Sequence, residues 1–197
     1  MKLFLIGTGL IGGSMSKDLR NLIDKIQIHG IDKNQINIKY AKDIGMIDNI
    51  DNLENLNKAD RVILSIPVSE SLKVLPFILD NLHKNALVWD VGSTKFNLCK
   101  SVERHPKRNQ FLATHPIAGN EFSGPEASIE NLFNGKDMIT TSLGFIMCIS
   151  IDPPDDAKDD NGATVDGDGI GYTIIAMDET AKNKYFLTYD GISGTIE

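Results

Sequence analysis

The fold is decided by the stretch Gly7-Thr8-Gly9-Leu10-Ile11-Gly12. It follows a short apolar run, Lys2–Ile6, which is typical of a strand buried on both faces of a parallel sheet. Beyond it, apolar residues recur at helical spacing over residues 10–23. The stretch therefore predicts a tight turn from a first buried strand into a first helix.

The glycine spacing of this turn, G-x-G-x-x-G, is typical of turns that bind a phosphate group. Gly7 permits the tight turn, Gly9 has no side chain to block an approaching phosphate, and Gly12 lets helix and strand pack closely. The helix N-terminus adds free N–H groups and a partial positive charge. The stretch therefore predicts a dinucleotide site at its six residues, including Thr8, Leu10 and Ile11.

Asp32 follows a second expected strand, residues 26–31, and lies at the spacing at which dinucleotide folds place an acidic residue. A carboxylate there accepts hydrogen bonds from ribose hydroxyls and repels a 2′-phosphate. We expect the cofactor to be NAD in preference to NADP.

Strands and helices alternate through the following residues. We expect strands at residues 61–66, 86–91 and 111–114, and helices at residues 36–44, 69–82 and 94–102, with Ser69 capping the second. This order predicts an α/β fold, a Rossmann-like, doubly wound, mostly parallel sheet. Ligands of such sheets lie beyond the carboxyl ends of the strands.

Charge and cysteine content narrow the class of protein. The formal net charge of −7 over 197 residues disfavours nucleic-acid partners, and no apolar run is long enough to span a membrane. Cys99 and Cys148 share no metal-ligand spacing, so we expect no metal site and a cytoplasmic location.

Three loops at expected strand ends carry further polar residues: residues 65–68, 90–95 and 114–121. Their backbone and side chains are expected to face the same cleft as the glycines. Ser65 and Pro67 are expected near the nicotinamide ribose.

At this point the sequence resembles the prephenate dehydrogenase family of tyrosine and aromatic amino-acid biosynthesis. The resemblance spans residues 1 to about 141 and rests on the pieces GTGLIGGS, SIPV, WDVGSTK, THPIAGNEFSGPEAS and LFNGKDMI, in the family's order. It implies an oxidoreductase that converts prephenate to 4-hydroxyphenylpyruvate with NAD(P)+ and loss of CO2. It also implies a homodimer.

The resemblance also implies roles for single residues. His115 matches the family's catalytic histidine, Ser93 a serine near the substrate hydroxyl and the nicotinamide, and Glu121 an acidic residue near the site entrance. A neutral imidazole with a pKa of about 6.5 can take up the hydroxyl proton near neutral pH. Lys95 is a further candidate for contact with the substrate.

The residues after about Thr141 differ in composition from the preceding part of the chain and match nothing in the family. Residues 142–197 hold three lysines, eleven carboxylates and no arginine. We expect an acidic loop at residues 152–168 and a β-hairpin from residues 172–177 and 185–189. Asp166-Gly167-Asp168-Gly169 has part of a calcium-loop pattern, without a glutamate at its twelfth position.

We therefore expect two parts, residues 1–141 as a dinucleotide-binding domain and residues 142–197 as an acidic tail. The family's helical domain, which dimerises and supplies an arginine to the substrate, is expected to be absent. Two alternatives stay open: a dinucleotide-binding module without catalysis, and a dehydrogenase acting on arogenate or another small acid.

Overall fold

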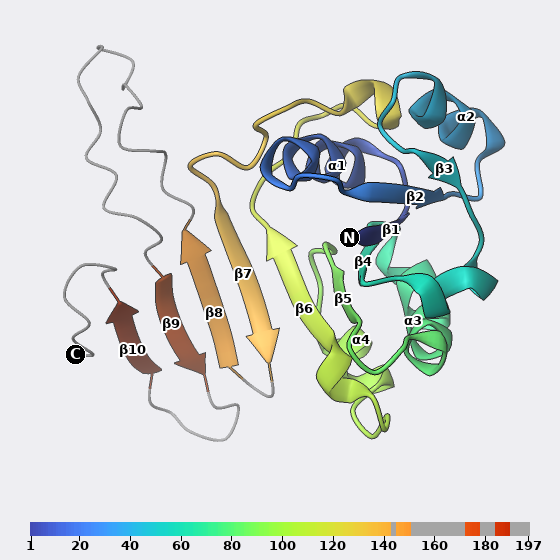
Figure 1. Ribbon diagram of the computed structural model, residues 1–197. Helices are drawn as coiled ribbons and strands as arrows, with labels where there is room; N and C mark the ends of the chain where they lie inside the picture. The colour runs from blue at the N-terminus through green and yellow to red at the C-terminus, as the bar shows by residue number, and fades with distance from the viewer. Residues whose placement is uncertain (143–144, 151–171, 178–183, 190–197) are drawn as a thin grey trace, which may run out of the picture. The chain divides into compact units, whose positions relative to one another are not determined.

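The computed structural model describes residues 1–142, 145–150, 172–177 and 184–189 (Figure 1). The chain divides into two compact units. The first consists of Met1–Ala113 with Gly119–Leu132, and the second of Thr114–Ala118 with Phe133–Glu197. Each unit is described by itself.

The first unit contains a parallel sheet in the order β3-β2-β1-β4-β5-β6, in which β6 takes part through Phe111–Ala113. This is the order of dinucleotide-binding folds, with the reversal of direction beside the first strand. The strands are β1 (Lys2–Ile6), β2 (Gln27–Ile31), β3 (Asn49–Ile50), β4 (Arg61–Leu64), β5 (Leu87–Asp90) and β6 (Phe111–Pro116). The predicted fold class is confirmed.

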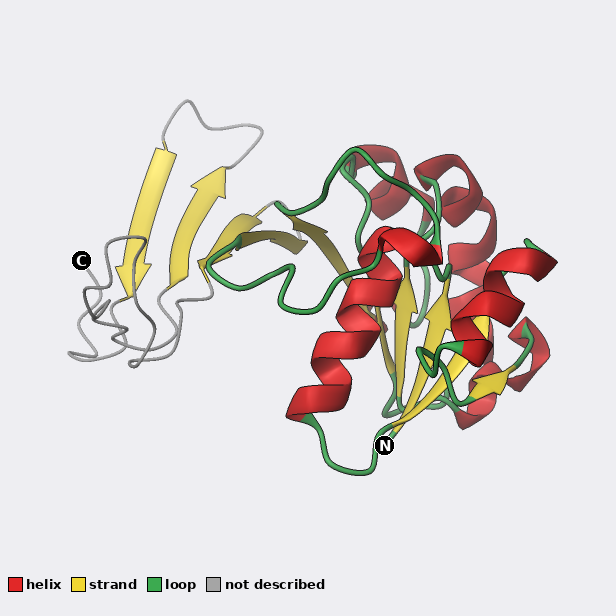
Figure 2. Cartoon of the chain, turned by 90° about the horizontal axis from the view of Figure 1, so that it is seen from above, coloured by secondary structure: helices red, strands yellow, loops and turns green. Residues whose placement is uncertain are grey.

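Helices cover both faces of this sheet because the strand residues alternate between two apolar layers. Phe4 and Ile6 of β1 belong to a core that also contains buried residues of the helices α3 (Val68–Asn81) and α4 (Phe96–Ser101). Leu5 faces α1 (Leu10–Leu22) on the other side. Figures 1 and 2 show the helices around the parallel strands.

The second helix on that side, α2 (Gln35–Asp43), has clear end signals in the sequence. The Asn34 side chain accepts hydrogen bonds from Ile36 N and Asn37 N, and Gly45 follows the helix with φ +73°. Gly30 of β2 packs against Ile38 of α2, so closely that a methyl group there would meet its Cδ1 at 3.0 Å.

Register brings the strand ends together at one edge. Ile6 lies opposite both Ile31 and Leu64, and Leu64 lies opposite Asp90. The segments that follow β1, β2, β4 and β5 therefore leave the sheet at the same edge, as the sequence predicts.

Several local expectations differ from the structure. The N-cap of α3 is Pro67, so Ser69 lies inside the first turn and does not cap the helix. Helix α4 is shorter than expected and begins at Phe96, and β6 extends to Pro116, which places His115 in a strand. The structure also contains elements that the sequence did not predict: β3 and the short 3-10 helices Leu53–Lys58, Arg108–Gln110 and Pro125–Ala127.

The second unit contains four antiparallel strands in chain order (Figure 1): β7 (Asp137–Ser142), β8 (Phe145–Ser150), β9 (Tyr172–Met177) and β10 (Lys184–Tyr189). The predicted hairpin is present as β9 and β10, with Met177 opposite Lys184. It continues a larger antiparallel arrangement that the sequence did not predict. The expected acidic loop and the calcium-like stretch lie outside the described residues.

Candidate functional site

The Gly-rich turn is shaped by the packing of its backbone. Gly7 has φ +95°, and a Cβ there would lie 2.1 Å from the carbonyl oxygen of Ser65. A Cβ on Gly12 would lie 2.4 Å from the carbonyl oxygen of Gly7. Both positions therefore require glycine for the fold itself.

Gly9 is different, because no atom of the described residues lies within 4 Å of the Cβ that it would carry. Its φ of −74° is ordinary for any residue. The space beside Gly9 is open, at the N-cap of α1, where backbone N–H groups have no partner within the helix. This is a cradle that suits the pyrophosphate of a dinucleotide.

Asp32 is held against the same turn. Its Oδ2 accepts hydrogen bonds from the Thr8 backbone N and the Thr8 hydroxyl, each 2.9 Å long, and its Oδ1 accepts one from Asn34 N at 2.8 Å. Thr8 is completely buried. Because a carboxylate can accept about four hydrogen bonds, Asp32 keeps capacity for a ribose hydroxyl. Thr8 contributes by fixing Asp32.

A cavity of about 310 Å³ lies next to the glycines, at the carboxyl ends of the strands. Its lining comes from the start of α1, from the segments after β4 and β5, and from the segment 119–132. The lining residues are Gly9, Leu10, Ile11, Ser65, Ile66, Val91, Gly92, Phe122, Ser123 and Gly124. Of the predicted cofactor residues outside the glycine turn, Ser65 lines this cavity, whereas Pro67 caps α3.

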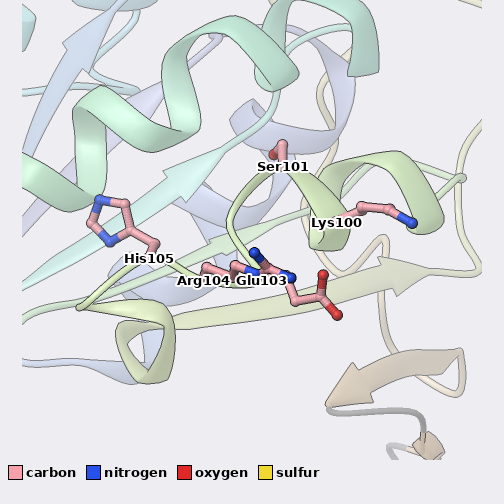
Figure 3. Close-up of a pocket in the computed structure, with 5 residues that line it drawn as sticks. All are labelled: Lys100, Ser101, Glu103, Arg104 and His105. Atoms are coloured by element: carbon pink, nitrogen blue, oxygen red, sulfur yellow. The ribbon is translucent and has the colours of Figure 1, made fainter.

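A larger surface hollow of about 500 Å³ is lined by Lys100, Ser101, Glu103, Arg104 and His105. Lys100 and Ser101 end α4, and the other three residues follow it before the start of β6, so the hollow is not at the carboxyl ends of the strands. Figure 3 shows Lys100 and His105 pointing in different directions. We therefore place the candidate site at the smaller cavity.

The loop after β5 is braced by a buried ion pair. The Lys95 ammonium contacts Oδ2 of Asp90, which also accepts a 3.0 Å hydrogen bond from Gly92 N. The side chains of Asp90 and Lys95 are only 1% and 12% exposed. Burial lowers the pKa of Lys95, against the attraction of Asp90. Ser93 is exposed between these two residues.

Residues 119–132 form a strap that is fastened to α1. Lys17 Nζ donates to the Ser128 carbonyl at 2.6 Å, Ile129 N donates to Ser14 Oγ at 3.0 Å, and Asn131 N donates to Asp18 Oδ1 at 2.7 Å. The strap carries the exposed residue Glu121. Sequence analysis did not identify Phe122, Ser123 and Gly124 as lining residues.

His115 belongs to the second unit, and its ring nitrogen Nδ1 is buried with no hydrogen-bond partner among the described residues. The catalytic role of His115 and the substrate roles of Ser93, Glu121 and Lys95 stay predictions. Within the ranges that the structure describes, no cluster of three or more potential ligand side chains could hold a metal ion. Likewise, none of the described helices is long and apolar enough to cross a membrane.

The strand order, the glycine turn and the fixed Asp32 define a dinucleotide-binding domain of the Rossmann class. The chain belongs to the prephenate dehydrogenase family, because residues 15–144 match the family model described as prephenate dehydrogenase, nucleotide-binding domain. The family resemblance seen in the sequence is thereby confirmed.

Curated relatives agree with this family. The chain is 32% identical over 143 residues to the prephenate dehydrogenase of Bacillus subtilis, a match that covers 71% of this chain and 38% of the relative. It is 28% identical over 139 residues to the cyclohexadienyl dehydrogenase of Zymomonas mobilis, covering 70% of this chain and 47% of that protein. The chain thus spans less than half of the length of these relatives.

A solved structure of prephenate dehydrogenase from A. aeolicus, in complex with hydroxyphenyl propionate and NAD+, is 35% identical with a TM-score of 0.67. The match covers 73% of this chain and 51% of that one. Arogenate dehydrogenase from Synechocystis is 28% identical with a TM-score of 0.64, covering 72% of this chain and 50% of the other. The expectation of a dinucleotide cofactor is confirmed at the level of the family.

Proposed function

We propose that this chain is the cofactor-binding part of an NAD-dependent dehydrogenase that converts prephenate to 4-hydroxyphenylpyruvate and CO2 in tyrosine biosynthesis. The observation that carries the proposal is the open cradle at Gly9 beside the fixed Asp32, in a chain of this family. Because the chain covers 38% of its Bacillus subtilis relative, the reaction is proposed for the protein that contains it.

The residues of the first unit bind and orient the cofactor in this proposal. The N–H groups at the start of α1 bind the pyrophosphate, and Asp32 accepts hydrogen bonds from the adenosine ribose. The same carboxylate repels the additional phosphate of NADP. When bound, NAD supplies the hydride acceptor of the reaction.

His115 is the proposed general base. The substrate carbon that bears the hydroxyl loses a hydride, and His115 takes the hydroxyl proton as the carbonyl forms. CO2 then leaves, the electrons of its bond to the ring make the ring aromatic, and the phenolate oxygen takes a proton back. The unpartnered Nδ1 of His115 supports this role, and general-base help is typically worth about 10²–10⁴-fold in rate.

Ser93, Glu121 and Lys95 act around the substrate in this scheme. Ser93 orients the substrate hydroxyl from the loop that the ion pair of Asp90 and Lys95 stabilises. Glu121 lies at the entrance, and Lys95 acts mainly by holding the loop. A cytoplasmic location completes the proposal for this chain, whereas the homodimer typical of the family is proposed only for the protein that contains it.

The main alternative is arogenate as substrate, since the Synechocystis relative is an arogenate dehydrogenase. Prephenate and arogenate differ by one amino group, so turnover of each compound separates them. A second alternative is a module that binds the dinucleotide without catalysis. The non-catalytic module would be supported if the chain bound NADH but turned over neither compound, whether tested alone or together with a complete partner subunit.

The test is NADH formation with prephenate by the protein that contains this chain, for the parent and for His115→Asn. We expect turnover by the parent and a loss of about 10²-fold or more in the variant. His83→Asn, on a partly exposed histidine outside the cavity lining, is the control and is expected to keep the parent rate. Equal rates for the parent and His115→Asn would refute the role of His115 as the general base.

A further inference from the structure

Phe122 is a large apolar side chain in an unusual place. It is 65% exposed, yet it belongs to the lining of the 310 Å³ cavity beside the Gly-rich turn. Removing an exposed phenylalanine side chain from water is favourable, so such a residue at a cavity mouth is suited to contact a ligand.

The strap presents Phe122 from a fixed position. Its downstream part is attached to α1, because the Ser128 carbonyl accepts a 2.6 Å hydrogen bond from the Lys17 ammonium. Within the strap, the Ser128 hydroxyl donates a 2.6 Å hydrogen bond to the Pro125 carbonyl. Closer to the ring, the Phe122 N–H donates to Asn120 Oδ1 at 2.9 Å. The strap therefore carries Phe122 beside the first turn of α1, in contact with the same cavity as Gly9.

The order of the strands assigns the two halves of the dinucleotide to the two sides of β1. Asp32 follows β2 and marks the adenosine side, and the pyrophosphate lies at Gly9 over β1. The nicotinamide half must then extend over β4 and β5 on the other side. Ser65, Ile66, Val91 and Gly92, which line the cavity with Phe122, follow β4 and β5.

We infer that Phe122 forms an aromatic wall for the nicotinamide half of the bound dinucleotide. This inference rests on the proposed function and adds a cofactor-binding residue to it. The flat ring offers a stacking or edge contact to the nicotinamide, and it excludes water from the carbon that receives the hydride. Ile66 and Val91 supply apolar surface in the same cavity.

The test compares two ligands, NAD+ and ADP-ribose, by titration calorimetry on the full chain. ADP-ribose has the pyrophosphate and both riboses but lacks the nicotinamide. We expect Phe122→Ala to raise the Kd of NAD+ about tenfold, and to leave the Kd of ADP-ribose within about twofold of the parent value. Phe122→Trp, which keeps an aromatic ring, is expected to retain most of the affinity for NAD+.

Phe96→Ala is the matched control, because Phe96 is 64% exposed in the same unit but lies on α4, away from the cavity lining. It is expected to bind both ligands as the parent does. An unchanged Kd of NAD+ in Phe122→Ala would overturn the inference, and so would equal losses for NAD+ and ADP-ribose. Normal binding by the parent without turnover of prephenate would count against the proposed reaction only.

Discussion

Substitution of Gly9 by alanine separates ligand binding from folding at the Gly-rich turn. The new methyl group meets no atom of the described residues within 4 Å, and the backbone at φ −74°, ψ −167° accepts alanine without strain. Reduced freedom of the unfolded chain stabilises the variant by about 0.4–1 kcal/mol. Loss of glycine at the helix N-cap costs a similar amount, so the free energy of unfolding should barely change.

The bound dinucleotide is affected much more strongly. The methyl group of Gly9→Ala occupies the open space beside the first N–H groups of α1, where the pyrophosphate is proposed to lie. Displacing the phosphate weakens a charge-assisted hydrogen bond, worth about 2 kcal/mol. We expect the Kd of NAD+ to rise ~30-fold.

Two measurements on each variant check this reasoning: titration calorimetry with NAD+ and urea denaturation. Gly12→Ala is the contrasting variant, because its Cβ would lie 2.4 Å from the Gly7 carbonyl oxygen and 2.9 Å from Leu5 Cδ1. It should lose about 1–3 kcal/mol of stability or more. Parent-like affinity for NAD+ in a folded Gly9→Ala chain would refute the placement of the pyrophosphate.

Three further predictions follow from the described contacts. Asp32→Ser should weaken the binding of NAD+ and reduce the preference for NAD+ over NADP+ by about tenfold or more, measured as the ratio of the two Kd values. An unchanged ratio would contradict the proposed hydrogen bond from the ribose to Asp32. Lys95→Met removes the ammonium beside the buried Asp90 and should cost about 3–5 kcal/mol of unfolding free energy in urea denaturation, whereas the exposed Lys84→Met should cost little. Burial alone would raise the pKa of Asp51. Hydrogen bonds from the Asn52 backbone and from the side chains of Asn55 and His29 outweigh this effect of burial, so the pKa of Asp51 lies below its ordinary value of 3.8. The stabilisation by Asp51 is therefore present above about pH 3.8 and is lost as pH falls further; Asp51→Asn should flatten this acid limb of the stability curve, and an unchanged limb would argue against the linkage.

The glycine turn and Asp32 could be predicted from the sequence because their signals are local. An apolar strand, three glycines at fixed spacing and a carboxylate after the next strand are all read within residues 2–32. The hydrogen bonds from Thr8 to Asp32 were missed, although a hydroxyl side chain in a buried turn position needs a polar partner.

The strap could not be predicted, since its contacts join residues far apart in the sequence. Lys17 and Ser128 are separated by 111 positions, and no periodicity in residues 119–132 indicates that this segment returns to α1. The exposure of Phe122 is likewise a property of the folded chain. Similarly, the apolar residues of β8 fit a buried strand or a buried helix equally well, so the pairing with β7 and β9 was not foreseen.

Lys95 shows how burial changes the interpretation of a charged residue. In the sequence it is one lysine in a strand-end loop, and lysines in such loops are usually solvated. In the structure it is 12% exposed and paired with Asp90, so its first effect is on the loop that carries Ser93. Its contact with the substrate stays a prediction.

We propose that a protein containing this chain couples oxidation of prephenate to loss of CO2. Simultaneous detection of NADH and CO2 tests this coupling, after prephenate and NAD+ are added to the protein that contains this chain. We expect equimolar release of NADH and CO2. NADH formation without CO2, or binding of NAD+ with no turnover of prephenate, would contradict it.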